Sequence, residues 1–192
     1  YITINISSPN TEGLRNFHDQ NQLKKLLSGL NKIKKEKKIN QPIAIKLSPD
    51  INDSEISKIV ELVKSESIQG IIVSNTTDGN RENLLDIKKK EIGGLSGQPL
   101  KDVSTKLIKK FYKETKGEVK IIGVGGVDSG ESAFEKITAG ADAVQLYTGM
   151  VYKGPGIVKE IKKELISILK KENLKNIGEA IGINAWPLII QE

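Results

Sequence analysis

The sequence of 192 residues contains no cysteine and only one histidine, His18. Without cysteine, disulfide bonds, thiolate metal ligands and a cysteine nucleophile are excluded. A single histidine cannot build a histidine-rich metal site, so no metal is expected, and nothing around His18 supports a Ser-His-Asp triad. Aromatic residues make up 4% of the chain. No apolar run reaches the length of about 18 residues typical of a transmembrane helix, and no signal peptide is visible.

The net charge is +6, and lysine carries most of the positive charge. Lysines cluster in "LKKLLSGLNKIKKEKK" and "EIKKELISILKKE", where apolar residues recur with helical spacing. This spacing places the lysines on the outer faces of amphipathic helices. Because arginine is scarce and no aromatic residues are interleaved, no nucleic-acid partner is expected, whereas an anionic membrane surface stays open as an alternative. The length suits one domain, 1–192, with a sizeable core.

Short apolar segments alternate with helical patterns along the whole chain. We expect strands at 1–7, 42–48, 70–76, 119–126 and 142–149, and helices at 23–35, 54–64, 104–114, 130–139 and 157–172. Such alternation is typical of an α/β fold with a parallel sheet and right-handed crossovers. A (β/α) barrel and an open doubly wound sheet both bind ligands at the carboxyl ends of their strands. A site is therefore expected at that edge.

Neutral hydrogen-bonding residues gather at the expected strand ends. Asparagine offers both a donor and an acceptor, so converging amides suit a planar ligand with carbonyl and ring N–H groups. Lys46 is the only charge in its strand, and its ammonium either reaches solvent or lies near a developing negative charge. The strand-end set comprises Asn5, Ser7, Ser8, Asn10, Lys46, Ser74, Asn75, Thr76, Thr77, Gly125, Gly126, Tyr147, Thr148 and Gly149.

Glycine-rich turns follow the last two expected strands, in "IIGVGGVDSG" and "AGADAVQLYTG". Backbone N–H groups of such turns bind phosphate, and barrels commonly hold a phosphate after their last two strands. A tight turn without a ligand is the alternative for "GVGG" alone. Asp128 is expected to be a cap or turn residue that opens the next helix. The connection from Thr77 to Lys101 is long for its place and is expected to be functional or mobile.

Six blocks in order resemble the class 2, quinone-dependent dihydroorotate dehydrogenases: "NISSPNTEGLR", "IKLSPD", "VSNTT", "GGLSGQPLKDVST", "IIGVGGVDSGESAFEKITAGADAVQLYTG" and "GPGIVKEIKKEL". The resemblance covers essentially the whole chain. It implies a (β/α)8 TIM barrel that binds FMN and oxidises dihydroorotate to orotate in de novo pyrimidine (UMP) biosynthesis. Electrons then pass to a quinone. The related class 1 enzymes have cysteine where Ser8 stands, so Ser8 favours class 2.

The resemblance also implies a role for individual residues. Ser8 corresponds to the base that takes a proton from dihydroorotate, and a relay through Thr11 or water would activate its hydroxyl. The residues implied to hold dihydroorotate or orotate are Asn5, Asn10, Asn75 and Thr76. Lys46 would lie beside the flavin and stabilise negative charge on its ring. The full set implied to bind FMN is Asn5, Lys46, Ser74, Gly97, Gly126, Tyr147 and Thr148.

The chain is shorter than the pattern it resembles. It corresponds to a C-terminal portion that begins at about the fourth barrel strand, so we expect an N-terminally truncated, incomplete barrel of about five parallel strands. The resemblance implies a peripheral location on the cytoplasmic side of the bacterial inner membrane, or else on the mitochondrial inner membrane, with contact through a missing N-terminal segment. Another FMN-barrel oxidoreductase and a catalytically incomplete fragment are the alternatives.

Overall fold

The computed structural model describes residues 1–79 and 81–186. Its centre is one sheet of five parallel strands, which neighbour each other in chain order. The strands are β1 (Ile2–Asn5), β2 (Ile43–Leu47), β3 (Gly70–Val73), β4 (Lys120–Val124) and β5 (Ala143–Gln145). The helices are α1 (Gln20–Glu36), α2 (Asp53–Ser65), α3 (Lys101–Thr115), α4 (Gly130–Thr138), α5 (Thr148–Lys153) and α6 (Ile157–Lys171). The expected α/β alternation with a parallel sheet is confirmed.

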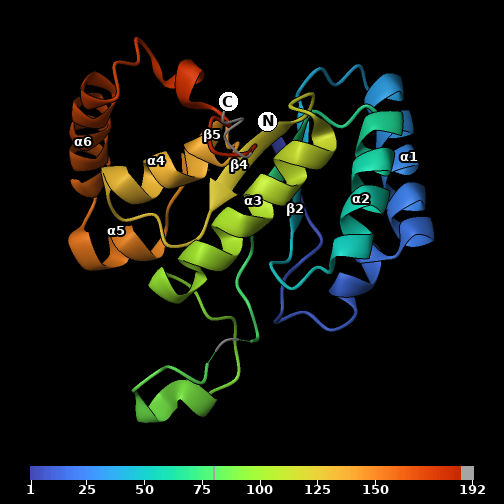
Figure 1. Cartoon of the computed structure of the whole chain (residues 1–192). Helices are drawn as coiled ribbons and strands as arrows, with labels where there is room; N and C mark the ends of the chain where they lie inside the picture. Colours follow the sequence, from blue (N-terminus) through green and yellow to red (C-terminus); the bar gives the residue numbers. More distant parts are fainter. Residues whose placement is uncertain (80, 187–192) are drawn as a thin grey trace, which may run out of the picture.

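The helices follow one another around the sheet as the strands do. α1 packs on α2, α2 on α3, α3 on α4, and α4 on α6. Figure 1 shows this arc, from α1 and α2 on one side of the molecule to α4 and α6 on the other. All neighbouring strands are parallel, so their carboxyl ends lie at one edge of the sheet.

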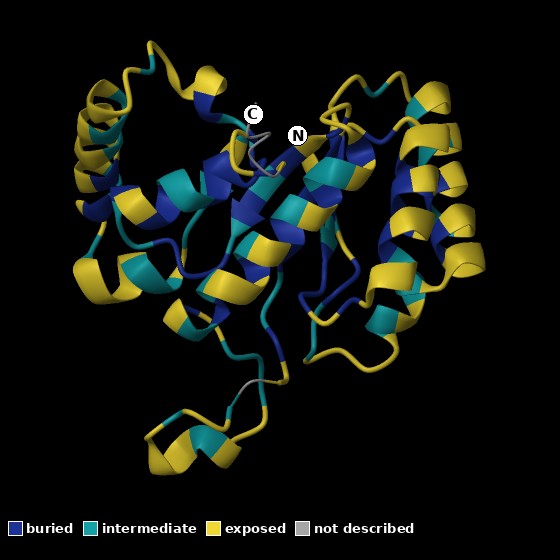
Figure 2. Cartoon of the chain, viewed as in Figure 1, coloured by how far each residue is buried: buried dark blue, intermediate teal, exposed yellow. Residues whose placement is uncertain are grey.

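The two faces of β2 explain why its sequence alternates. Ile43, Ile45 and Leu47 are buried and join a core that includes Ile59 and Val63 of α2. Burying such side chains is the main favourable term in folding. Figure 2 shows the same division on the helices, whose buried faces turn inward and whose exposed faces turn outward. Lys46 lies on the other face of β2 and is half-buried.

Capping residues fix the first residue of a helix, which the spacing of apolar residues predicts only approximately. The Asp19 side chain accepts hydrogen bonds from the N–H groups of Asn21 and Gln22, so α1 begins three residues before the expected start. Of the two roles expected for Asp128, cap or turn residue, the structure shows the second: Asp128 precedes the cap of α4, and its backbone N–H donates to Ser132 Oγ at 3.0 Å. Ser129 is the cap, and its side chain and Ser132 bond each other's backbone N–H groups in a capping box.

Two expected segments differ from the structure. The expected strand 142–149 includes the first turn of α5, because the strand stops at Gln145 and the helix begins at Thr148. The long connection after β3 forms an excursion, defined as the segment between Thr77 and Leu95. Its neck is closed by paired backbone hydrogen bonds between those two residues, of 2.7 and 3.2 Å. Figure 1 shows it projecting from the body of the molecule.

The sheet does not close on itself within the described ranges 1–79 and 81–186, so β1 and β5 are its edges. A hydrogen bond joins β5 to the residue before β1, because Gln145 Nε2 donates to the Tyr1 hydroxyl at 2.7 Å. This agrees with the expectation of an incomplete barrel with about five strands. Among the described residues, no helix has both the length and the apolar character needed to cross a bilayer.

Candidate functional site

An amide cluster forms where β1, β2 and β3 end. Asn5 lies beside Lys46 in the register of β1 and β2, and Asn75 follows β3. The Asn75 amide donates to Asn5 Oδ1 and to Ser7 Oγ, both at 3.1 Å. Asn5 Oδ1 also accepts from the Ser7 backbone N–H at 3.3 Å, so its acceptor is satisfied within the protein. Among the described residues, no acceptor takes a hydrogen bond from Asn5 Nδ2, which leaves that amide as a donor for a ligand.

Ser7 is the centre of this cluster, and the sequence placed it among the strand-end residues without giving it a role of its own. It is fully buried, and its hydroxyl lies 2.7 Å from the Lys46 carbonyl oxygen. The hydroxyl therefore ties β1 to β2 while it orients Asn5 and Asn75. The period of two along the strand would have found it, because Asn5 and Ser7 share one face while Ile4 and Ile6 share the other.

A cavity of about 830 Å³ opens beside the cluster at the same edge of the sheet. Its wall contains six of the seven residues expected to bind the cofactor, namely Lys46, Ser74, Gly97, Gly126, Tyr147 and Thr148. Asn75 and Thr76, expected to bind substrate, line it as well. Asn5 is the expected cofactor residue that is absent from the wall, and it connects to the cavity through its hydrogen bond to Asn75.

Lys46 supplies a positive charge to this cavity. Burial lowers the pKa of its ammonium below the ordinary lysine value, because removal from water disfavours the charged form. No carboxylate among the described residues bonds this ammonium. The sequence left open whether Lys46 reaches solvent, and the structure places it at the wall of the cavity.

The opposite wall of the cavity is backbone that requires glycine. Gly97, Gly125 and Gly126 have φ values of +80°, +117° and +68°. A Cβ on Gly126 would lie 2.6 Å from Lys101 Cβ and 2.9 Å from Lys101 Cα. A Cβ on Gly97 would lie 3.0 Å from Thr148 Cγ2. The backbone of this wall is thus available to a ligand at close range, as in phosphate-binding turns.

Hydroxyl groups lie beside the glycines. Thr148 Oγ1 and Ser96 Oγ are 2.9 Å apart, which joins the start of α5 to the segment before α3. Tyr147 precedes α5 and lines the cavity, although the residue is 78% exposed. Ser74 is buried, and its hydroxyl donates to the Asn75 carbonyl at 3.1 Å.

Ser8, Asn10 and Thr11 lie on the loop after β1, outside the wall of the cavity. Ser8 Oγ accepts a hydrogen bond of 3.3 Å from the Asn10 backbone N–H. Asn10 and Thr11 are exposed. In the described part of the chain no hydrogen bond joins Ser8 to Thr11, so the relay expected through Thr11 is not preformed.

Arg15 anchors the loop that carries Ser8. It follows the loop on a short 3-10 helix, Leu14–His18, and its guanidinium lies 2.7 Å from Asp78 and 3.3 Å from Asp50. Asp50 also accepts from the Thr77 hydroxyl at 2.5 Å. These contacts tie the segments after β1, β2 and β3 to one another. Sequence reasoning missed Arg15, because its partners are 35 and 63 residues away along the chain.

Comparison with known proteins gives one consistent result. A family model described as "Dihydroorotate dehydrogenase" matches residues 1–169. The dihydroorotate dehydrogenase (quinone) of Trichodesmium erythraeum is 46% identical over 191 residues, which cover 95% of this chain and 50% of that protein. The mitochondrial dihydroorotate dehydrogenase (quinone) of Mus musculus is 40% identical over 186 residues, which cover 96% of this chain and 47% of that protein.

Solved structures give the same relationship. The crystal structure of DHODH from Eimeria tenella in complex with ferulenol superposes with a TM-score of 0.92 at 36% identity, covering 97% of this chain and 54% of that one. The ligand-free form has a TM-score of 0.91 at 35% identity. The likeness places the five-stranded sheet in the TIM-barrel family. The chain spans about half the length of the curated relatives it matches.

Proposed function

The chain belongs to the dihydroorotate dehydrogenase family, and from this we propose that it carries active-site residues for oxidation of dihydroorotate to orotate in de novo pyrimidine (UMP) biosynthesis. The observation that carries the proposal is the cavity of about 830 Å³, where a lysine, an amide pair and a glycine turn from separate strands meet. The dehydrogenase activity of the whole protein is part of the proposal, since this chain spans about half of its relatives.

The residues at the cavity fit FMN. The volume lies within the range of roughly 300–1,000 Å³ that is usual for small-molecule and cofactor sites. Gly126, Tyr147 and Thr148 would hold the phosphate, since their turns present backbone to the cavity. Gly97, Ser74, Asn5 and Lys46 would hold the remainder of the molecule. When bound, FMN supplies hydride acceptance from the substrate carbon.

Lys46 acts through its charge in this proposal. Its ammonium lies at the cavity wall on rigid strand β2, so its position needs no rearrangement during the reaction. A fixed cation in a partly dry site stabilises negative charge more than a solvated one does. The lowered pKa follows from that same removal from water.

The amide cluster orients the substrate. Asn75 Nδ2 donates to Asn5 Oδ1 and to Ser7 Oγ, and the Ser7 backbone N–H also donates to Asn5 Oδ1. The free Asn5 Nδ2 would then donate to a carbonyl or carboxylate oxygen of dihydroorotate. Thr76, at the cavity wall, and Asn10, on the loop, complete the proposed substrate set.

Ser8 is the proposed proton acceptor. A serine hydroxyl is a weak base in water, so it needs closure of its loop over the substrate to exclude water and to supply a proton path. Thr11 or a water molecule would provide that path after the loop moves. Arg15 holds the base of this loop, whereas Ser8 itself makes only the 3.3 Å contact with Asn10.

A quinone is the proposed electron acceptor, because the similar proteins of Trichodesmium and mouse are named as quinone enzymes. Quinones reside in lipid bilayers, so we propose a peripheral location at the bacterial inner membrane, with the mitochondrial inner membrane as the alternative.

The experiment that tests the function follows flavin absorbance in the full-length protein. Purified protein should show bound flavin, and dihydroorotate added without an acceptor should bleach it. Ser8→Ala should retain the flavin and lose at least about 100-fold in the bleaching rate, because removal of a catalytic base typically costs 100- to 10,000-fold. Ser167→Ala, on the exposed surface of α6, is the matched control and should bleach at the wild-type rate.

Bleaching of Ser8→Ala at the wild-type rate would remove Ser8 from the mechanism. Absence of flavin from the wild type would reject the FMN proposal itself. Bound flavin that dihydroorotate does not bleach would favour another FMN-barrel oxidoreductase.

A further inference from the structure

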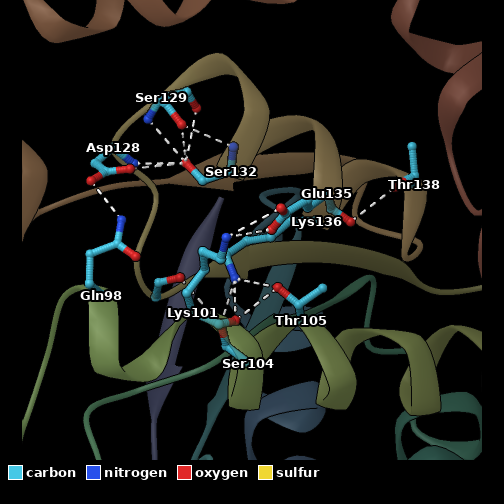
Figure 3. A network of polar contacts seen from close by, with 11 residues as sticks. Gln98, Lys101, Ser104, Thr105, Asp128, Ser129, Ser132, Glu135, Lys136 and Thr138 are labelled. Carbon is cyan, nitrogen blue, oxygen red and sulfur yellow. Dashed lines mark hydrogen bonds and ion pairs between the residues drawn. The ribbon is translucent and has the colours of Figure 1, made fainter.

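Lys136 is the least expected buried group in the molecule. It lies on α4 and is 0% exposed, although it carries an ammonium. Lysine is almost never fully buried unless it is paired. Figure 3 shows its side chain extending from α4 toward the first turn of α3, where Lys101, Ser104 and Thr105 lie. This location is directly behind the glycine wall of the cavity.

Three neutral oxygens hold the ammonium. Lys136 Nζ lies 2.6 Å from Ser104 Oγ, 3.0 Å from Thr105 Oγ1 and 3.2 Å from the Lys101 carbonyl oxygen. These contacts use all three N–H donors of the ammonium. They satisfy its hydrogen bonding but leave its charge without a carboxylate partner.

The nearby charged groups do not neutralise Lys136. Glu135 on the same helix pairs with Lys101 at 3.1 Å, as Figure 3 shows. Asp102 on α3 is exposed. Asp128 accepts from Gln98 at 2.6 Å, and Glu164 on α6 bonds the Gly130 N–H. The positive end of α3 adds to the positive potential at this point. Among the described residues, therefore, no carboxylate bonds the Lys136 ammonium directly.

Two contacts connect Lys136 to the glycine turn. Ser104 Oγ accepts one N–H of the ammonium, and its hydroxyl proton has two acceptors in reach, the Lys101 carbonyl oxygen at 3.1 Å and the Gly125 carbonyl oxygen at 3.3 Å. The Lys101 carbonyl oxygen accepts another N–H of the ammonium. Lys101 also packs closely on Gly126, since a Cβ on Gly126 would lie 2.6 Å from Lys101 Cβ. Moving or discharging the ammonium would thus disturb both residues of the turn.

We propose that Lys136 is a positioning residue for the phosphate end of the flavin site, where it fixes the Gly125–Gly126 turn through Ser104 and Lys101 and supplies positive charge behind it. This inference rests on the proposed function, since it assumes that the turn holds the FMN phosphate. An apolar residue would fill the same volume without the desolvation cost of a buried ion. A bound phosphate dianion would offset that cost.

The test compares FMN with riboflavin, which is the same flavin without the phosphate. Affinities are measured on the full-length apoprotein by quenching of flavin fluorescence. Lys136→Gln keeps two N–H donors and removes the charge. We expect about tenfold weaker FMN binding, the size expected for loss of a partly screened charge pair, with riboflavin affinity changed less than twofold. Lys106→Met, on the exposed face of α3, is the control for net charge and should bind both flavins like the wild type.

The wild type offers a second measurement that needs no variant. Burial lowers the pKa of Lys136 to about 8, while the FMN phosphate, with a second pKa near 6, stays dianionic above pH 7. Raising the pH from 7 to 9 should therefore weaken FMN binding relative to riboflavin as Lys136 loses its proton. Lys46, at the same cavity, is proposed to meet the flavin ring, which both ligands share, so it should leave the ratio unchanged.

Equal effects of Lys136→Gln on FMN and riboflavin, or no effect on either, would overturn the inference and leave the proposed function intact. If the variant does not fold, a wild-type affinity ratio that is constant from pH 7 to 9 overturns it equally. A wild type that binds neither flavin rejects the proposed function, and the inference with it.

Discussion

Single glycines at the cavity wall allow their backbone to pack closely against neighbouring segments. Gly126 combines a φ of +68° with a neighbour whose backbone lies 2.9 Å from the place of a Cβ. A backbone atom cannot rotate away as a side chain can. The positive φ alone disfavours an L-residue by roughly 1–2 kcal/mol.

Gly126→Ala should therefore lower the free energy of unfolding by about 2 kcal/mol or more and abolish flavin retention. Gly29→Ala is the matched control, because Gly29 lies in the exposed face of α1 with nothing within 4 Å of a new Cβ. It should raise stability by roughly 0.5–1 kcal/mol. Urea unfolding and flavin content after gel filtration measure both effects. Equal loss of stability in both variants would contradict the close approach at Gly126.

Residue patterns foretold part of the site. Lys46 could be predicted because one charge among alternating apolar residues is conspicuous, and Asn5 because strand alternation places it on the same face. Ser7 could be placed at the strand ends but not at the centre of the hydrogen bonds, and Lys136 could not be predicted. Ser7 gains its importance from partners on β2 and after β3. Lys136 looks like an ordinary helical lysine until α3 is placed over it, and only tertiary packing does that.

Among the elements, the loop after β1 is the one that carries the proposed base, and its attachment is ionic. Arg15 joins it to Asp50 and Asp78 at side-chain exposures of 30%, 35% and 57%. Ion pairs this exposed contribute little to global stability, so their effect should be local.

Arg15→Ala should leave the free energy of unfolding within roughly 1 kcal/mol of the wild type but speed cleavage of residues 8–19 by a protease of low specificity. Lys32→Ala is the control, since it breaks a well-exposed ion pair with Glu36 inside α1. Mass spectrometry of the first fragments gives the cleavage site. Unchanged cleavage in Arg15→Ala would show that the ion pairs do not restrain the loop.

Helices and strands could be predicted where their apolar residues recur regularly, but the residues at which they begin and end could not. The cap Asp19 lies outside the apolar pattern of α1, so the pattern alone begins the helix late. The start of α5 has no apolar stripe of its own, and the chain there reads as a continuation of β5. The position of a helix end is set by hydrogen bonds between its backbone and a capping side chain, and the apolar period does not show these bonds.

For the whole molecule, the open edge of β1 has a consequence for association. Ile2 on this edge is 40% exposed, and an unpaired strand offers its backbone groups to another chain. The isolated 192-residue chain should associate as its concentration rises, and Ile2→Lys should reduce this, because a charge on an edge strand disfavours pairing. Sedimentation velocity measures it. Ile166→Lys, on the exposed face of α6, is the control, and an equal reduction there would implicate general surface apolarity instead.

The order of strands and helices was predictable at this scale because each crossover has only one favoured hand. The path of the excursion between Thr77 and Leu95 could not be predicted. Three of its large apolar residues, Leu85, Ile87 and Ile92, are almost fully exposed, whereas a sequence pattern places such residues in the core.

The neck of that excursion has a consequence for tolerance to change. Thr77 and Leu95 hold each other by two backbone hydrogen bonds, so the chain leaves the sheet and returns to it at nearly one point. The segment between these two residues therefore begins and ends at nearly the same place, whatever its length. Because the entropy of loop closure grows only by about 0.6 kcal/mol for each doubling of length, an inserted peptide here would leave the strands behind the neck nearly undisturbed. The neck makes the part of this segment beyond Asp78, which pairs with Arg15, a natural attachment point for a tag or a fluorescent label.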